Sequence, residues 1–256
     1  NALFGIGAMA APLIAAPSVS EGLYAPAFLS AAVLPAMLLL VLLLRPAKAL
    51  SVPTGNAPAE STEGDPAGSA SPVRAGLPVV IGFLAIYVFY LGSENSLTSW
   101  IPTHMSLFHG GEAAARYAGV FWASITVGRF LVGILGGKLA PRIIVNAGGV
   151  GTALFLLLAF VPGMRTLAYI GAGLFLGPVF PAGLGWIAER VPRRSGMVSS
   201  LAVAAGGAGA ALFPPIVGAV VDTVGAQAIP GVIALVAASL AAVAIVMAVH
   251  EGRHAR

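Results

Sequence analysis

Long apolar stretches without Lys, Arg, Asp or Glu dominate the pattern of this chain. A helix needs about 20 apolar residues to cross the hydrocarbon core of a bilayer, so each such stretch predicts one membrane-spanning helix. Seven stretches are uncharged, and an eighth is interrupted by two arginines. In chain order the eight predicted spans are 1–20, 22–44, 75–93, 113–136, 143–164, 166–188, 195–221 and 223–249.

The spans are predicted to be helices. They lack the period-two alternation that a membrane barrel needs. Gly and Pro inside them are common in packed membrane helices, and the prolines mark expected bends. These prolines are Pro12, Pro35, Pro178, Pro181, Pro214 and Pro215.

The composition leads to the same conclusion. Of the 256 residues, 58% are hydrophobic and only 9% are charged, against about a quarter charged in an ordinary soluble domain. Too few polar side chains exist to coat a compact body in water, so the expected solvent is lipid. The chain has no cysteine, which excludes disulfides, thiolate metal sites and thiol catalysis. The net charge of +4 is spread over loops, which argues against nucleic acid as a partner.

The basic residues predict the orientation. If residue 1 lies on the cytoplasmic side, ten of the 13 Lys and Arg residues fall on that side. The positive-inside rule then predicts a multi-pass protein of the cell membrane (plasma or inner) with both ends cytoplasmic. The ten are Arg45, Lys48, Arg74, Lys138, Arg142, Arg190, Arg193, Arg194, Arg253 and Arg256.

A repeat and a linker predict the domain organisation. The pattern G-x-G-x4-P occurs at Gly5, Gly7 and Pro12 and again at Gly207, Gly209 and Pro214, six spans later. An even number of spans makes the two helices parallel, as in carriers with two repeated bundles. We expect the last two helices of a truncated N-terminal bundle, a flexible linker rich in Pro, Ser, Gly and Ala, a C-terminal six-helix bundle and a cytoplasmic tail. Their ranges are 1–45, 46–76, 77–250 and 251–256.

Several motifs resemble the major facilitator superfamily of secondary transporters. The segment from Gly137 to Arg142, GKLAPR, is similar to the family's G-x-L-a-D-R loop, with Pro141 in place of the Asp. Because Pro141 replaces the family's Asp, the charge-relay role usually given to that carboxylate is in doubt in this loop. The Gly-Pro helices resemble the family's fifth and eleventh helices. The segments YLGSE (90–94) with Trp100, and GPVFP (177–181), are similar to fucose-permease-like sugar/proton symporters. The resemblance implies an all-α membrane protein with about eight of twelve transmembrane helices present.

Glu94 is the first candidate for a site on the transport pathway. A charge inside a membrane helix costs about 2.5–3.5 kcal/mol on insertion scales, so it needs a reason. Helical spacing places Tyr87, Tyr90 and Thr98 on the same face as Glu94. Burial favours the neutral form of a carboxyl group, a property that a proton-coupled carrier can use. Alternatively, Glu94 lies near the outer end of its span and meets extracellular water.

Arg129 is the second candidate, and it shares a helix face with Trp122 and Thr126. It can bind an anionic or hydroxylated substrate, or pair with a carboxylate in the absent half of the protein. Alternatively, it snorkels to the cytoplasmic interface, about 10 Å away.

The remaining candidates have structural alternatives. The aromatic side chains can stack on a sugar or an apolar solute, or they can pack and anchor the helices. They are Tyr87, Tyr90, Trp122, Phe180 and Trp186. Gly206, Gly207 and Gly209 are expected to allow close helix approach. His104 and His109 are expected in a solvated outer loop, and His250 and His254 lack a third metal ligand.

These features predict a secondary transporter that moves a small solute, a sugar or similar metabolite, by alternating access between two bundles. Proton-coupled symport is the expected mode, and a drug or metabolite efflux antiporter is the main alternative. A channel would need a polar filter, and an intramembrane enzyme would need clustered catalytic residues. We expect no enzymatic activity, cofactor or metal. The expected partners are the solute, H⁺, the lipid bilayer and the missing N-terminal helices of the same chain.

The truncated first bundle generates a testable prediction. We expect residues 1–256 alone to show no gradient-driven uptake in proteoliposomes, because half of the central site belongs to helices before residue 1. Measurable uptake by this segment, above that of empty liposomes, would contradict the expectation of a missing half.

Overall fold

The computed structural model describes residues 76–135 and 138–254, together with positions 29, 32, 33, 36, 37 and 40. The predicted linker, most of the first two predicted spans, and the motif residues Gly5, Gly7, Pro12 and Gly137 lie outside the described residues.

From residue 76 onward the described chain is a succession of helices. They are α3 (Leu77–Ser106), α4 (Gly111–Leu135), α5 (Pro141–Leu157), α6 (Arg165–Leu176), α7 (Val179–Arg190), α8 (Ser195–Val224) and α9 (Ile229–His254). Single 3₁₀ turns, η2 (Leu158–Phe160), η3 (Pro192–Arg194) and η4 (Ala226–Ala228), lie between them. Six helical segments are long and apolar enough to cross a membrane. This confirms the six spans predicted after residue 74.

One of the six spans consists of two helices. α6 and α7 together form the segment Arg165–Arg190, and the regular helix is interrupted at Gly177 and Pro178. Proline has no N–H to donate and its ring clashes with the preceding turn, which explains the break. The interruption coincides with Pro178, one of the predicted bend positions, whereas Pro214 and Pro215 lie within the continuous helix α8.

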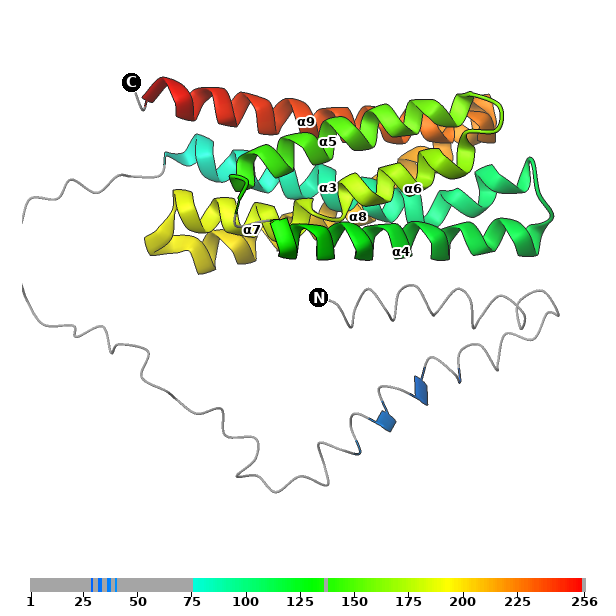
Figure 1. Cartoon of the computed structure of the whole chain (residues 1–256), viewed down its shortest axis with the longest axis horizontal. Helices are drawn as coiled ribbons and strands as arrows, with labels where there is room; N and C mark the ends of the chain where they lie inside the picture. The colour runs from blue at the N-terminus through cyan, green and yellow to red at the C-terminus, as the bar shows by residue number, and fades with distance from the viewer. Residues whose placement is uncertain are drawn as a thin grey trace, which may run out of the picture.

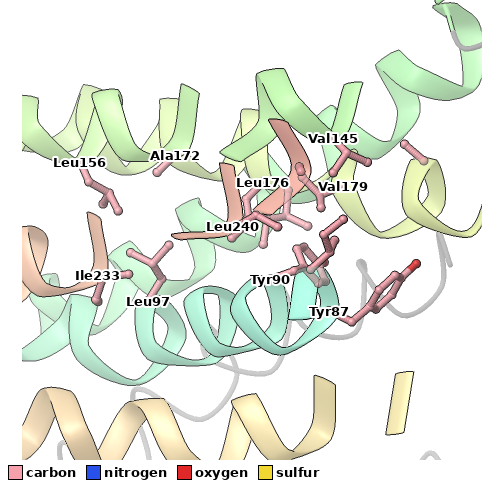
Figure 2. Packing of buried hydrophobic residues seen from close by; sticks show 14 of the residues in the cluster. Tyr87, Tyr90, Leu97, Val145, Leu156, Ala172, Leu176, Val179, Ile233 and Leu240 are labelled. Atoms are coloured by element: carbon pink, nitrogen blue, oxygen red, sulfur yellow. The ribbon is translucent and has the colours of Figure 1, made fainter. Parts of the chain in front are cut away.

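The helices run side by side along the long axis of the molecule (Figure 1). α3 occupies the middle of the bundle and packs against α8, α9 and α4, while α5 packs against α9 and α6. Buried side chains from these helices form one core. Figure 2 shows part of it, where Tyr90 of α3 lies near Leu176, Val179 and Leu240, and Leu97 lies beside Ile233.

The outer surface of the bundle is apolar. Large hydrophobic side chains are exposed on α4, α5 and α9, including Ile134 at 76%, Leu154 at 58% and Leu235 at 71%. A soluble monomer rarely exposes so many large apolar side chains. The bundle is therefore suited to a lipid environment.

The third predicted span is too short in the sequence interpretation. α3 continues past residue 93 to Ser106, because Glu94 does not end the apolar helix. A search for uncharged stretches stops at any charged residue, including one that has an opposite charge beside it in the fold.

α3 and α8 approach each other closely through glycine. A Cβ added at Gly209 would overlap the carbonyl oxygen of Val88, and one at Gly206 would lie 3.0 Å from the carbonyl oxygen of Tyr87. Nearby, Trp100 Nε1 donates a hydrogen bond of 2.9 Å to the Pro214 carbonyl. Gly207 faces the other way, and no described atom lies within 4 Å of a Cβ built there. The expectation of close approach at Gly207 is therefore not met in the described bundle.

The unusual proline of the loop motif, Pro141, is explained by its position at the start of a helix. Pro141 is the first residue of α5, and Ala140 is its N-cap. Proline fits the first turn of a helix because the N–H it lacks would have no partner within the helix. Arg142 follows it in the same turn.

The two glycines of α8 provide a matched test of this packing. We expect Gly209→Ala to lower the free energy of unfolding by about 1–3 kcal/mol, because the added methyl group overpacks the contact with Val88. Gly207→Ala should leave it unchanged or raise it by up to about 1 kcal/mol, the gain in helix propensity. Unfolding of the detergent-solubilised protein, followed by tryptophan fluorescence, measures both. Equal stability of the two variants would contradict the close contact.

Candidate functional site

The candidate site is centred on Glu94, which lies in the interior of α3 with 5% of its surface exposed. The other carboxyl groups in the described spans, those of Glu189 and Asp222, lie close to the ends of their segments. A carboxylate in the apolar interior is stable only with a partner.

Arg129 of α4 is that partner. Its Nη2 lies 3.3 Å from Glu94 Oε2, and its side chain is 13% exposed. The same Nη2 donates to the Tyr90 hydroxyl oxygen at 3.1 Å. The Tyr90 hydroxyl in turn donates to Glu94 Oε2. The three side chains therefore form a closed network in which a carboxylate, a guanidinium and a phenol contact one another.

A backbone carbonyl oxygen is a further hydrogen-bond acceptor for Arg129. Its Nε donates a long hydrogen bond of 3.4 Å to the carbonyl oxygen of Gly177, at the break between α6 and α7. Arg129 thus joins three parts of the bundle: its own helix, α3 and the α6–α7 bend.

Aromatic rings border the network. The rings of Tyr87 and Tyr90 lie 5.5 Å and 6.0 Å from the ring of Phe180, centroid to centroid. The Tyr87 hydroxyl donates to the Phe180 carbonyl at 2.9 Å. The structure therefore brings together five of the predicted residues: Glu94, Arg129, Tyr87, Tyr90 and Phe180.

The side chains of four other predicted residues make the following contacts. The hydroxyls of Thr98 and Thr126 donate to carbonyls of their own helices, those of Glu94 and Trp122, at 2.8 Å each. Trp122 is 8% exposed and packs edge-on against Phe121. Trp186 packs against Phe83, with centroids 5.4 Å apart.

For each of the two charged residues, the structure disagrees with one of the alternatives left open by the sequence. Glu94 is buried inside a continuous helix and does not meet outer water at the end of a span. Arg129 has a carboxylate partner, Glu94, within the same bundle. Both alternatives stay open in the sequence because the partner of a charge lies 35 residues away and no local pattern connects the two.

A second buried polar pair was also missed. His104, expected in a solvated loop, is 3% exposed within α3. Its Nδ1 lies 2.7 Å from the hydroxyl of Tyr169 on α6. The apolar spacing of Leu97 and Ile101 places His104 on the buried face, and this periodicity could have predicted its burial. His109, by contrast, is exposed, with its Nε2 3.3 Å from the Tyr117 hydroxyl.

In the part of the chain that the structure describes, no group of three or more metal-ligating side chains is found. The side chains of the Glu94 network can exchange a proton at the carboxyl group and bind an anion or a hydroxyl group at the guanidinium.

Comparisons with known proteins find a matching family model and several curated relatives. Residues 117–255 match the family model described as Major Facilitator Superfamily. The probable nitrate/nitrite transporter NarK2 of Mycobacterium tuberculosis is 32% identical over 199 residues, covering 73% of this chain and 49% of NarK2. A putative glucose/galactose transporter of Helicobacter pylori is 30% identical over 154 residues, covering 56% of this chain and 36% of that protein. The chain thus spans about half the length, or less, of these curated relatives.

The ion pair makes a prediction about stability. We expect Glu94→Gln and Arg129→Gln each to lower the free energy of unfolding by about 3–5 kcal/mol, because each leaves one buried charge without its partner. The double variant should lose less than the sum of the two, by about 0.5–3 kcal/mol. Equilibrium unfolding in mixed micelles measures the cycle, and strictly additive losses would show that the two groups do not interact.

Proposed function

The chain belongs to the Major Facilitator Superfamily, and we propose that it is part of a secondary transporter that moves a small solute together with protons by alternating access. The solute is a small metabolite. The observation that carries the proposal is the buried network of Glu94, Tyr90 and Arg129.

The cost of the network argues for a role beyond stability. Two charges inside an apolar bundle must be desolvated, and their mutual attraction often does no more than offset that cost. Apolar side chains of similar volume would hold α3 and α4 together without this loss. A pair that persists in the interior of a membrane protein is therefore better explained by a task that needs an ionisable group.

Protonation of Glu94 is the proposed coupling step. A proton from water binds a carboxylate oxygen of Glu94, and the attraction to Arg129 Nη2 is lost. The Tyr90 hydroxyl then has a neutral neighbour in place of a carboxylate. The contact between α3 and α4 is weakened as a result, and the guanidinium is released to bind solute. Deprotonation restores the pair, so the site alternates between two arrangements with different binding properties.

Alternating access needs a second bundle. We propose that the complete carrier has an N-terminal bundle, that residues 1–45 form its last two helices, and that residues 46–76 connect it to the bundle of residues 77–250. The solute would bind between the bundles, with both chain ends in the cytoplasm and the protein in the plasma or inner membrane. The arginine-rich loops of the described spans support this orientation.

Uptake by the complete carrier tests the proposal. The carrier is reconstituted in liposomes, and radiolabelled glucose, galactose, nitrate and nitrite serve as probes, because the relatives are named for these solutes. We expect at least one probe to accumulate when the pH inside is higher than outside, and to bring protons with it. Accumulation that requires a proton gradient of the opposite direction would identify an efflux antiporter instead.

A single substitution tests the role of Glu94. Glu94→Gln cannot release a proton, so we expect proton-driven accumulation to fall by about 10²-fold or more. Exchange of internal for external solute should continue, because it needs only the loaded carrier. Glu189→Gln is the matched control, since Glu189 is an exposed acid at the end of its span. Accumulation by Glu94→Gln at the rate of the control would exclude Glu94 as the coupling group.

A further inference from the structure

The charge count of the site points to the class of solute. In the described structure Arg129 and Glu94 form a pair with no net charge. The pair, with the Tyr90 hydroxyl bonded to both, is enclosed by the bundle: Tyr90 is fully buried and Glu94 is 5% exposed. In alternating access the bundles rock around this site, and twice per cycle, once loaded and once empty, the site is closed off from water. Each closure is least costly when the site is neutral.

Arg129 keeps binding capacity beyond its present contacts. Nη2 donates to Glu94 and Tyr90, and Nε donates to the Gly177 carbonyl. The N–H groups of Nη1 make no hydrogen bond with any residue that the structure describes. A guanidinium presents its donors as a planar fork, which matches two oxygens of a carboxylate or another planar oxyanion.

We propose that the solute is a small metabolite with a single negative charge, a monocarboxylate, which takes the place of Glu94 at Arg129 once Glu94 is protonated. This inference rests on the proposed proton coupling. The ligand that the guanidinium holds in the structure is itself a carboxylate, that of Glu94. The solute replaces it with a group of the same shape and charge.

Neutrality favours this class over a neutral sugar. The empty carrier returns with Glu94 ionised and Arg129 positive, so these two groups together contribute no net charge. The loaded carrier moves with Glu94 neutral, Arg129 positive and the bound carboxylate negative, and these groups again contribute no net charge. With a neutral sugar, the loaded site would carry an uncompensated positive charge. With a monocarboxylate bound to the unprotonated site, it would carry an uncompensated negative one.

Binding of the proton and of the anion is therefore mutually favourable. A proton on Glu94 frees the guanidinium for the anion, and the anion at Arg129 favours the protonated form of Glu94. Linkage requires the two effects to be equal in size. One proton and one monovalent anion then cross together, and no net charge crosses the membrane.

The test compares gluconate with glucose, two solutes with the same six-carbon skeleton that differ in a carboxylate, and adds lactate as a smaller carboxylate. The complete carrier in proteoliposomes receives either a pH gradient or a potassium/valinomycin potential. We expect gluconate or lactate to accumulate about tenfold or more with the pH gradient, with no acceleration by an inside-negative potential. Glucose uptake driven by both gradients would overturn the inference but leave the proposed proton coupling intact. Uptake of neither carboxylate would overturn it as well.

Ligand-induced shifts in the melting temperature of the purified carrier supply the second readout. Wild type should be stabilised by the carboxylate in acidic buffer and not in alkaline buffer. Glu94→Gln should be stabilised in both, and Arg129→Gln in neither. Arg129→Lys keeps the charge but loses the fork, so its stabilisation should be intermediate. It also serves as a folded reference if Arg129→Gln melts before ligand is added. Carboxylate uptake without proton movement, unchanged in Glu94→Gln, would overturn the proposed function itself.

Discussion

A charge inside an apolar bundle must find an opposite charge, and this constraint determines how the centre of the structure is built. Glu94 and Arg129 meet 3.3 Å apart, and the helices that carry them are placed accordingly. Glu94 has almost no access to water, so removal of Arg129 leaves an ion without solvation. The pair is thus an obligatory contact between α3 and α4, and a change in the charge of either member alters how these two helices pack.

α3 transmits this constraint to the rest of the bundle because it lies in the middle and contacts α4, α8 and α9. Its contact with α8 is close, since Gly206 and Gly209 bring the α8 backbone against that of α3. Interfaces of this kind, with small residues and backbone contact, hold membrane helices together where there is no hydrophobic effect between them. The face of α8 that carries Gly207 remains open in the described bundle.

The sequence predicts the spans well and the site in part. Apolar stretches predict helices directly, because a lipid-embedded backbone must bond within its own segment. Helical spacing also places Tyr87, Tyr90 and Glu94 on one face of α3, where the structure has them together. The depth of Glu94, the partner of Arg129 and the burial of His104 were wrong or missed. The depth of Glu94 and the partner of Arg129 depend on a residue of another helix, and a pattern within one helix carries no record of that neighbour. The burial of His104, by contrast, could have been read from the apolar spacing of Leu97 and Ile101 in its own helix.

The α6–α7 bend supplies a hydrogen-bond acceptor for Arg129, although Gly177 and Arg129 are 48 residues apart in sequence. In a regular helix the Gly177 carbonyl would accept from the N–H of residue 181, but residue 181 is proline and has none. The next N–H, of Ala182, makes its regular helical bond to the Pro178 carbonyl. The Gly177 oxygen is thus left for a side chain, and Arg129 Nε reaches it at 3.4 Å. Gly177 also lets α4 approach, since a Cβ there would overlap the Ile125 carbonyl. The GPVFP segment therefore both bends the span and orients the guanidinium that pairs with Glu94.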